Sequence, residues 1–385
     1  MYREEDLRKR TWPVKPPAYR GDYSPYVREG RIINRVLRNH QSLSEPIPDG
    51  ESAITSLCRG CHGRIYGATS GVRSHLFLYD PGPGGDGVCD IGVIPGATGV
   101  RQALVAAPDG TLYGAISEGP EAGRLFRCLT DRDFQNEFGY GCGPVEMLGV
   151  PVPGEGIAGL VLDGRRRRFY GVSRASGKFF YYDLQDDRSE VKAELDAKGR
   201  FSERLVLDGA GVVYGCRSEG EFFRYDPAVD RLEGLGAHLP ALAGREMYNR
   251  LESAVFNDYD GLIYGGGSAD GVLFSLDPAS GRVRSLGKAS AAAGCPALAA
   301  GFDGRIYGIS GTRSGMARLF RYDPDEHSLE DLGLPLAASE TFWHGYEFSA
   351  ACTGSAGEIY LGESDRVSHL FIYFPPVLRR RRADV

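Results

Sequence analysis

Two short segments of this 385-residue chain combine the residue types needed for acid–base chemistry on a polar substrate. They are Tyr248-Asn249-Arg250-Leu251-Glu252 and Trp343-His344-Gly345-Tyr346-Glu347. Arginine and glutamate bind carboxylate and hydroxyl groups, and histidine transfers protons near neutral pH. If the protein is an enzyme, the catalytic candidates are therefore Arg250, Glu252, His344 and Tyr346.

Two further arginines, Arg101 and Arg204, stand just ahead of predicted strands, as Arg250 does. If all these segments meet at one end of the molecule, they form a pocket for a small polar or sugar ligand. Trp343 and Tyr346 would then either stack on a sugar ring or simply pack between sheets and plug a channel. The binding candidates are Arg101, Arg204, Tyr248, Arg250, Glu252, Trp343, His344 and Tyr346.

A cysteine motif raises two cofactor hypotheses. Cys58-Arg59-Gly60-Cys61-His62 has the spacing of a c-type haem attachment site. Cys352 stands in a repeat that we expect beside this one, so Cys58, Cys61, His62 and Cys352 together could instead form a Cys₃His zinc site. Buried free thiols are the plainer interpretation. We expect no cofactor, with haem c and zinc as the alternatives.

The elements that would position these residues follow from a repeat. A tyrosine, followed in six of seven copies by glycine, recurs at intervals of 43 to 57 residues, at Tyr66, Tyr113, Tyr170, Tyr214, Tyr264, Tyr307 and Tyr360. This interval is the length of a four-stranded propeller blade. In the unit around Tyr307 we predict strands at residues 297–302, through Tyr307, at 319–322 and around 329–332, with an Asp303-Gly304 turn between the first two.

A serine three or four residues after each of these tyrosines allows two interpretations. Its hydroxyl can fix the turn by bonding a backbone N–H, or the serines can form a ring of hydroxyls for a polar ligand. The serines are Ser70, Ser117, Ser173, Ser218, Ser268, Ser310 and Ser364.

The last repeat lacks a fourth strand, and residues 31–37 have the length and alternation to supply it. The sequence therefore predicts an all-β, seven-bladed β-propeller closed by an N-terminal strand that completes the last blade. Over residues 31–376 the chain resembles the seven-bladed propeller superfamily. Its Asp-Gly, Tyr-Gly and Tyr-Asp-Pro pattern is closer to the gluconolactonase-like and quinoprotein-like bacterial propellers than to WD-repeat or kelch proteins, which carry a tryptophan in every unit.

Composition and the N-terminal sequence narrow the classes of function and the cellular location that we expect. The net charge of -6 argues against nucleic-acid binding, and no segment has the length and apolarity of a membrane span. The N-terminal sequence lacks the pattern of an export signal, so we expect a cytoplasmic protein whose eight cysteines are thiols.

The expected organisation is an extended, proline-rich and aromatic arm at residues 1–30, one propeller at 31–376 and a basic tail at 377–385. The arm would pack on its own propeller or on a partner, with loops adding to the contact. We therefore predict a non-catalytic binding or scaffold propeller in a protein complex or homo-oligomer. The alternatives are a carbohydrate- or lactone-active enzyme that uses the channel mouth and a c-type haem redox subunit.

Overall fold

The computed structural model describes residues 26–39, 42–81, 87–130, 143–196, 199–312, 316–339 and 342–376. These residues form an all-β fold, in which the helical elements are three 3₁₀ turns, η1 (Cys61–Gly63), η2 (Ser218–Gly220) and η3 (Glu246–Tyr248). Of the predicted arm, the structure describes residues 26–30. The predicted tail lies outside the described residues.

Five sheets have four strands each, and the chain builds them one after another. In chain order their strands are β7 (Leu104–Ala106), β8 (Thr111–Ala115), β9 (Leu125–Leu129) and β10 (Glu146–Met147); β11 (Ile157–Asp163), β12 (Arg168–Ser173), β13 (Lys178–Asp183) and β14 (Arg188–Glu194); β15 (Leu205–Leu207), β16 (Val213–Cys216), β17 (Glu221–Asp226) and β18 (Arg231–His238); β19 (Leu251–Asn257), β20 (Leu262–Gly267), β21 (Val272–Leu276) and β22 (Val283–Lys288); and β23 (Ala297–Ala300), β24 (Ile306–Ser310), β25 (Arg318–Asp323) and β26 (Ser328–Gly333).

A nine-stranded sheet joins the two ends of the described chain. Its strands are β29 (Phe348–Thr353), β30 (Ile359–Glu363), β31 (His369–Phe374), β1 (Arg31–Asn39), β6 (Val88–Val93), β5 (His75–Tyr79), β4 (Ile65–Ser70) and β3 (Ala53–Arg59), with β2 (Ser42–Pro46) paired to β1. A separate hairpin of β27 (Leu336–Ala338) and β28 (Phe342–His344) precedes β29, and the sequence did not predict it.

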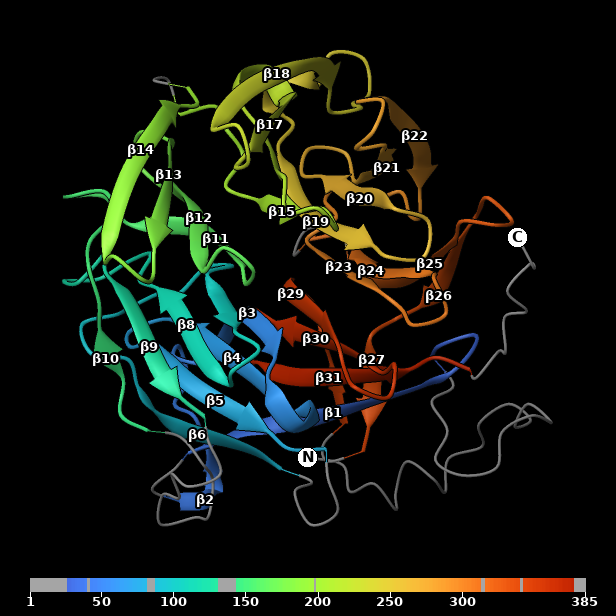
Figure 1. Ribbon diagram of the computed structural model, residues 1–385. Coiled ribbons are helices and arrows are strands. Elements are labelled where there is room, and N and C mark those ends of the chain that lie inside the picture. The colour runs from blue at the N-terminus through green and yellow to red at the C-terminus, as the bar shows by residue number, and fades with distance from the viewer. Residues whose placement is uncertain are drawn as a thin grey trace.

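The sheets follow one another in a ring around a common axis (Figure 1). The first strands, β3, β7, β11, β15, β19, β23 and β29, face this axis. Each of them contacts the first strand of the next sheet, and β29 contacts β3. The unit around Tyr307 has the four strands that the sequence predicts.

Strand β1 makes the junction that the sequence predicts. Residues Arg31 to Val36 pair antiparallel with Phe374 to His369 of β31. On the other edge, Leu37 and Arg38 pair in parallel with Val88 and Cys89 of β6. The N-terminal strand thereby covers the sheet edge that β31 would otherwise expose.

Buried contacts explain why the repeat has its residue types. The hydroxyl of Tyr307 donates to Asp303 of the preceding turn at 2.8 Å, and its ring packs against Tyr373 of the next sheet at 5.7 Å between centroids. A methyl group at the following glycine, Gly308, would overlap the ring of Phe320. The same tyrosine-to-tyrosine packing recurs at 5.6 to 5.7 Å in Tyr170–Tyr225, Tyr264–Tyr322 and Tyr360–Tyr79.

The described end of the arm packs on the protein's own sheets. Val27 is buried and forms a bridge with Gly333, and the Glu29 carboxylate accepts a 2.6 Å hydrogen bond from Arg321. Residues 1–25 and the tail at 377–385 lie outside the described residues. A partner for the arm therefore stays a prediction.

One sequence-based expectation about the cysteines is wrong. Cys128 is disulfide-bonded, whereas Cys58, Cys61, Cys89, Cys216, Cys295 and Cys352 are free thiols.

Candidate functional site

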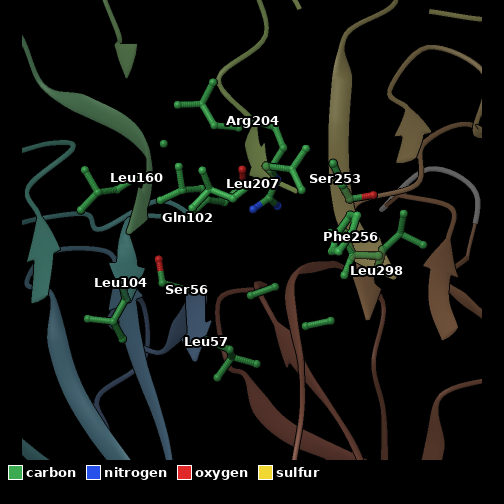
Figure 2. Close-up of a pocket in the computed structure, with 18 of the residues that line it drawn as sticks. Ser56, Leu57, Gln102, Leu104, Leu160, Arg204, Leu207, Ser253, Phe256 and Leu298 are labelled. Atoms are coloured by element: carbon green, nitrogen blue, oxygen red, sulfur yellow. The ribbon is translucent and has the colours of Figure 1, made fainter. Parts of the chain in front are cut away.

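A cavity of about 280 Å³ lies on the axis, between the first strands of the sheets. Figure 2 shows its walls, with Leu57, Leu104 and Leu160 on one side and Ser253, Phe256 and Leu298 on the other. The first strands supply all of these side chains, so the site is built by the parts of the repeat that are nearest the axis.

Strand register determines which residue enters the cavity at each level. In each first strand, one residue pairs with the glycine of the Tyr-Gly step, or with Leu361 in the last copy. These seven paired residues define the reference level along the axis. Six of the seven first strands carry a small residue one position before the reference level. These residues are Ser56, Ala103, Gly159, Ser253, Ala297 and Ala350. The exception is Arg204, which places a long cation at a level that is otherwise lined by small residues.

Arg204 points its guanidinium into the cavity (Figure 2). Its Nε donates a long hydrogen bond of 3.4 Å to the backbone oxygen of Glu252. Burial lowers the pKa of Arg204 to about 10, against the opposing charges of Glu252 and Glu203. Among the described residues it has no ion-pair partner, and it is the one charged residue in the cavity lining.

Glu252 lies beside Arg204 but outside the lining. Its Oε2 accepts a 2.6 Å hydrogen bond from the backbone N–H of Cys295. Burial raises the pKa of Glu252 to about 7, although that hydrogen bond and the charge of Arg204 oppose the shift. A carboxyl group that titrates near neutral pH suits acid–base chemistry.

Gln102 lines the cavity in an unusual backbone conformation. Its φ is 50°, in the left-handed region that non-glycine residues seldom adopt. Hydrogen bonds hold this geometry on both sides, from Gln102 N–H to Thr55 O at 2.9 Å and from Leu160 N–H to Gln102 O at 3.3 Å. The strands of three sheets are thereby tied together next to the cavity.

A charged belt of Arg101, Glu118, Arg174 and Glu203 lies at the end of the sheets where the chain leads into the first strands. Glu118 accepts hydrogen bonds from Arg174 and, at 2.9 Å, from Arg101. These bonds lower the pKa of Glu118 although burial opposes them. Arg174 also reaches Glu203 at 3.5 Å, and burial raises the pKa of that carboxyl group.

The predicted binding residues do not form one cluster. Arg101, Arg204 and Glu252 lie at or near the cavity, whereas Tyr248 is 71% exposed and lines a separate surface pocket with Gly244, Arg245, Ser268 and Ala269. Arg250 donates to the backbone oxygens of Met247 and Asn249 at 3.0 and 2.8 Å. Its side chain therefore fixes its own loop.

Trp343, His344 and Tyr346 belong to a third place, the β28 strand and the turn after it. The Trp343 indole N–H donates to Glu363 at 2.9 Å, and the indole ring packs on His369 at 4.2 Å between centroids. His344 packs on Tyr346 at 4.3 Å, and burial lowers the pKa of His344. None of the three side chains lines the central cavity.

The cysteines of the haem-like motif point to different neighbours. The Cys58 thiol is buried beside Cys352, whose charge raises the pKa of Cys58 further after the larger effect of burial. The Cys61 sulfur contacts Thr130 Oγ1 at 3.6 Å in the next sheet. In the described part of the chain, no group of three His, Cys, Asp or Glu side chains is arranged to hold a metal ion. Haem at Cys58, Cys61 and His62 and zinc with Cys352 stay predictions.

Serine hydroxyls after the Tyr-Gly step fix the loops in at least two sheets. Ser117 Oγ accepts the backbone N–H of Arg101 at 2.8 Å, and Ser268 Oγ accepts that of Arg250 at 3.0 Å. These two serines therefore position the segments that lead into the first strands, 16 and 18 residues earlier in the chain, and not their own turns.

The sequence missed the pairing within the charged belt. Glu118 and Arg174 are on loops between second and third strands of neighbouring sheets, and their contact spans 56 residues. The signal available was the alternation of charge sign on consecutive loops, which the repeat brings side by side.

Comparison with known proteins supports the fold and leaves the activity open. No protein-family model and no curated protein matches the chain. Among solved structures, a catalytically inactive virginiamycin B lyase from Staphylococcus aureus with quinupristin is similar over 90% of this chain and 100% of its own, with a TM-score of 0.63 and 9% identity. A streptogramin B lyase has a TM-score of 0.58 and 14% identity over 90% and 98%.

A second kind of protein shares the architecture. The extracellular domain of a putative one-component system from B. thetaiotaomicron matches over 89% of this chain and 40% of its own, with a TM-score of 0.61 and 13% identity. Together these similarities show a β-propeller-like, all-β fold. No helix in the described residues is long and apolar enough to span a membrane.

Proposed function

We propose that the chain is a seven-bladed β-propeller, closed where β1 joins β31, and that it is a non-catalytic binding protein with a small ligand in its central cavity. The observation that carries this proposal is the guanidinium of Arg204, which enters the cavity without an ion-pair partner among the described residues. A desolvated cation opposes folding unless a counter-charge meets it. A ligand with an acceptor group would supply that counter-charge.

The variant Arg204→Met tests the proposal, because it keeps an unbranched side chain, though a shorter one, and removes the charge. We expect the free variant to melt at or above the temperature of the wild type, since the desolvated charge is gone. We also expect it to lose the rise in melting temperature that organic anions or sugars give to the wild type. Arg188→Met, on the exposed outer strand β14, is the matched control and should keep that rise.

If no compound in a broad panel of anions and sugars shifts the melting of the wild type, the binding role is wrong. A shift that Arg204→Met retains in full would place the ligand elsewhere.

A specific observation favours an enzyme as the second candidate. Glu252, with a pKa of about 7, lies beside Arg204 but outside the cavity lining, so it would act as a general base on a carbohydrate or lactone held by Arg204 that extends beyond the lining. This version requires turnover, and Glu252→Gln should abolish it while leaving binding intact.

A contact with a protein partner remains part of the proposal. Leu242, Met247 and Tyr248 expose 48%, 56% and 71% of their surface on one loop. Exposed apolar side chains gathered in this way are typical of contact surfaces. Association through this loop and the arm is compatible with a ligand in the central cavity.

A further inference from the structure

We infer that the ligand of the central cavity is an amphipathic organic anion, with an apolar body and one carboxylate head that meets Arg204. The inference rests on the proposed binding function and adds the chemical class and the orientation of the ligand.

The cavity lining changes character along the axis. Near the start of the first strands its polar residues are Thr55, Ser56, Gln102, Arg204 and Ser253. From the reference level onward, every lining residue is apolar: Leu57, Leu104, Leu160, Val161, Leu205, Val206, Leu207, Ala254, Val255, Phe256, Leu298 and Ala351. One end of the cavity therefore suits a polar head and the rest suits a hydrocarbon body.

The apolar end discriminates against sugars. A sugar ring carries hydroxyl groups around its whole edge, and each hydroxyl that is buried against leucine, valine or phenylalanine loses its hydrogen bonds to water. An alkyl or aryl body in the same place has no such penalty and gains from leaving water. The distribution of side chains thus favours a ligand that is polar at one end only.

The polar end selects a negative charge. Arg204 is the one charged residue of the lining in the described structure, and its Nε is already directed to the Glu252 backbone oxygen. The two Nη groups are thereby left for the ligand, and a planar guanidinium matches the two oxygens of a carboxylate. The hydroxyl of Ser56 is directed to the Val100 backbone oxygen at 2.8 Å. Ser56 therefore forms part of the cavity wall, and its hydroxyl proton is already donated to the protein.

Two carboxylates act on the charge of Arg204 from outside the cavity lining, where they oppose the lowering of its pKa by burial. Glu203 and Glu252 are outside the lining, and Glu252 is hydrogen-bonded to Cys295 of the neighbouring sheet. Arg174 of the charged belt lies 3.5 Å from Glu203. The positive charge that a ligand meets in the cavity is therefore that of Arg204.

Isothermal titration calorimetry on the full chain tests the inference with four probes: octanoate, octanamide, gluconate and glucose. We expect octanoate to bind at pH 7 and the isosteric neutral octanamide to bind at least 10-fold more weakly. Arg204→Met should weaken octanoate binding by at least 10-fold, to about the affinity of octanamide, whereas Arg188→Met should leave it unchanged. About 1.4 kcal/mol corresponds to each 10-fold change.

A second variant addresses the apolar end. Leu207→Gln places an amide among the apolar lining residues, so it should weaken octanoate binding several-fold. Circular dichroism and the melting temperature establish that each variant is folded, and Val206→Thr, of nearly equal volume, replaces Leu207→Gln if that variant unfolds.

The outcomes distinguish a failure of the amphipathic-ligand inference from a failure of the proposed binding function. Binding of gluconate or glucose that depends on Arg204, with no binding of octanoate, overturns the amphipathic ligand and leaves the proposed binding function standing. Equal affinity for octanoate and octanamide also overturns the inference, because the charge would then not matter. Failure of all four probes and of a broad panel of anions and sugars overturns both.

Discussion

Arg204 is the side chain on which the proposed binding function rests. At its level the other first strands carry serine, alanine or glycine, which leave the axis open. A guanidinium there is desolvated, with its pKa lowered to about 10, and it receives one long hydrogen bond in return. Such a group opposes folding, so its presence is better explained by a ligand than by stability.

Glu252 leads to a prediction about pH. Because its pKa is raised from 4.5 in the unfolded chain to about 7, the folded state binds its proton more tightly than the unfolded state does. Stability should therefore fall as the pH rises from about 4.5 to about 7 and stay level above that range. The variant Glu252→Gln lacks this titration and keeps an oxygen for the Cys295 N–H.

We expect Glu252→Gln to match the wild type at pH 5 and to exceed it at pH 8 by on the order of 2 kcal/mol, after allowance for solvent at this half-buried carboxylate. Urea unfolding at the two pH values measures the difference. Glu326→Gln, on an exposed turn, is the control and should behave alike at both. An equal effect of Glu252→Gln at pH 5 and pH 8 would contradict the assignment.

The candidate site was only partly predictable at this scale. Arg204 and Glu252 were found because one stands just ahead of β15 and the other at the start of β19, both of which the repeat locates. Irregular pairing at the start of β3, β11, β19 and β29 changes which side chains face the axis, and the sequence does not mark these bulges. The separate hairpin β27–β28 holds Trp343 and His344 away from the cavity lining, with the Trp343 indole bonded to Glu363 of β30.

The strands themselves were predictable, since tertiary contacts impose the repeat. All seven repeat tyrosines lie in second strands, namely β4, β8, β12, β16, β20, β24 and β30. Glycine follows six of them because the phenylalanine of the third strand occupies the space where a side chain would be. In β30 the glycine is replaced by Leu361.

This packing predicts the effect of a single methyl group. In Gly114→Ala the added Cβ would overlap the ring of the buried Phe126, so we expect a loss of about 1–3 kcal/mol in the free energy of unfolding. Gly87→Ala is the matched control, because no atom lies within 4 Å of its Cβ, and it should change stability by less than about 0.5 kcal/mol. Chemical denaturation of both variants provides the comparison.

A further variant isolates the cause. If the ring is what the methyl group meets, Gly114→Ala combined with Phe126→Leu should cost less than the sum of the two single changes. Strict additivity would mean that the glycine serves another purpose.

For the whole molecule, the decisive feature is that the two ends of the chain share one sheet. Strand β1 pairs with β31 on one edge and with β6 on the other, so contacts between residues more than 330 positions apart complete the ring. Among the described strands, β1 pairs with β2, β31 and β6 and with none of the first strands. The spacing of the first strands around the axis nevertheless depends on this junction. A cavity formed between sheets keeps its shape only while the ring holds together.

Leu37 is the side chain that tests this dependence, because it is 1% exposed and sits at the pairing of β1 with Val88 of β6. Leu37→Ala should lower the free energy of unfolding by about 2–5 kcal/mol. It should also speed amide hydrogen exchange in both β31 and β6, which are remote in sequence, more than in β20 on the other side of the ring. Val191→Ala, on the exposed outer strand β14, should do neither. Faster exchange confined to β1 itself would show that the sheets on either side do not rely on it, and the ring would then be held by the contacts between first strands alone.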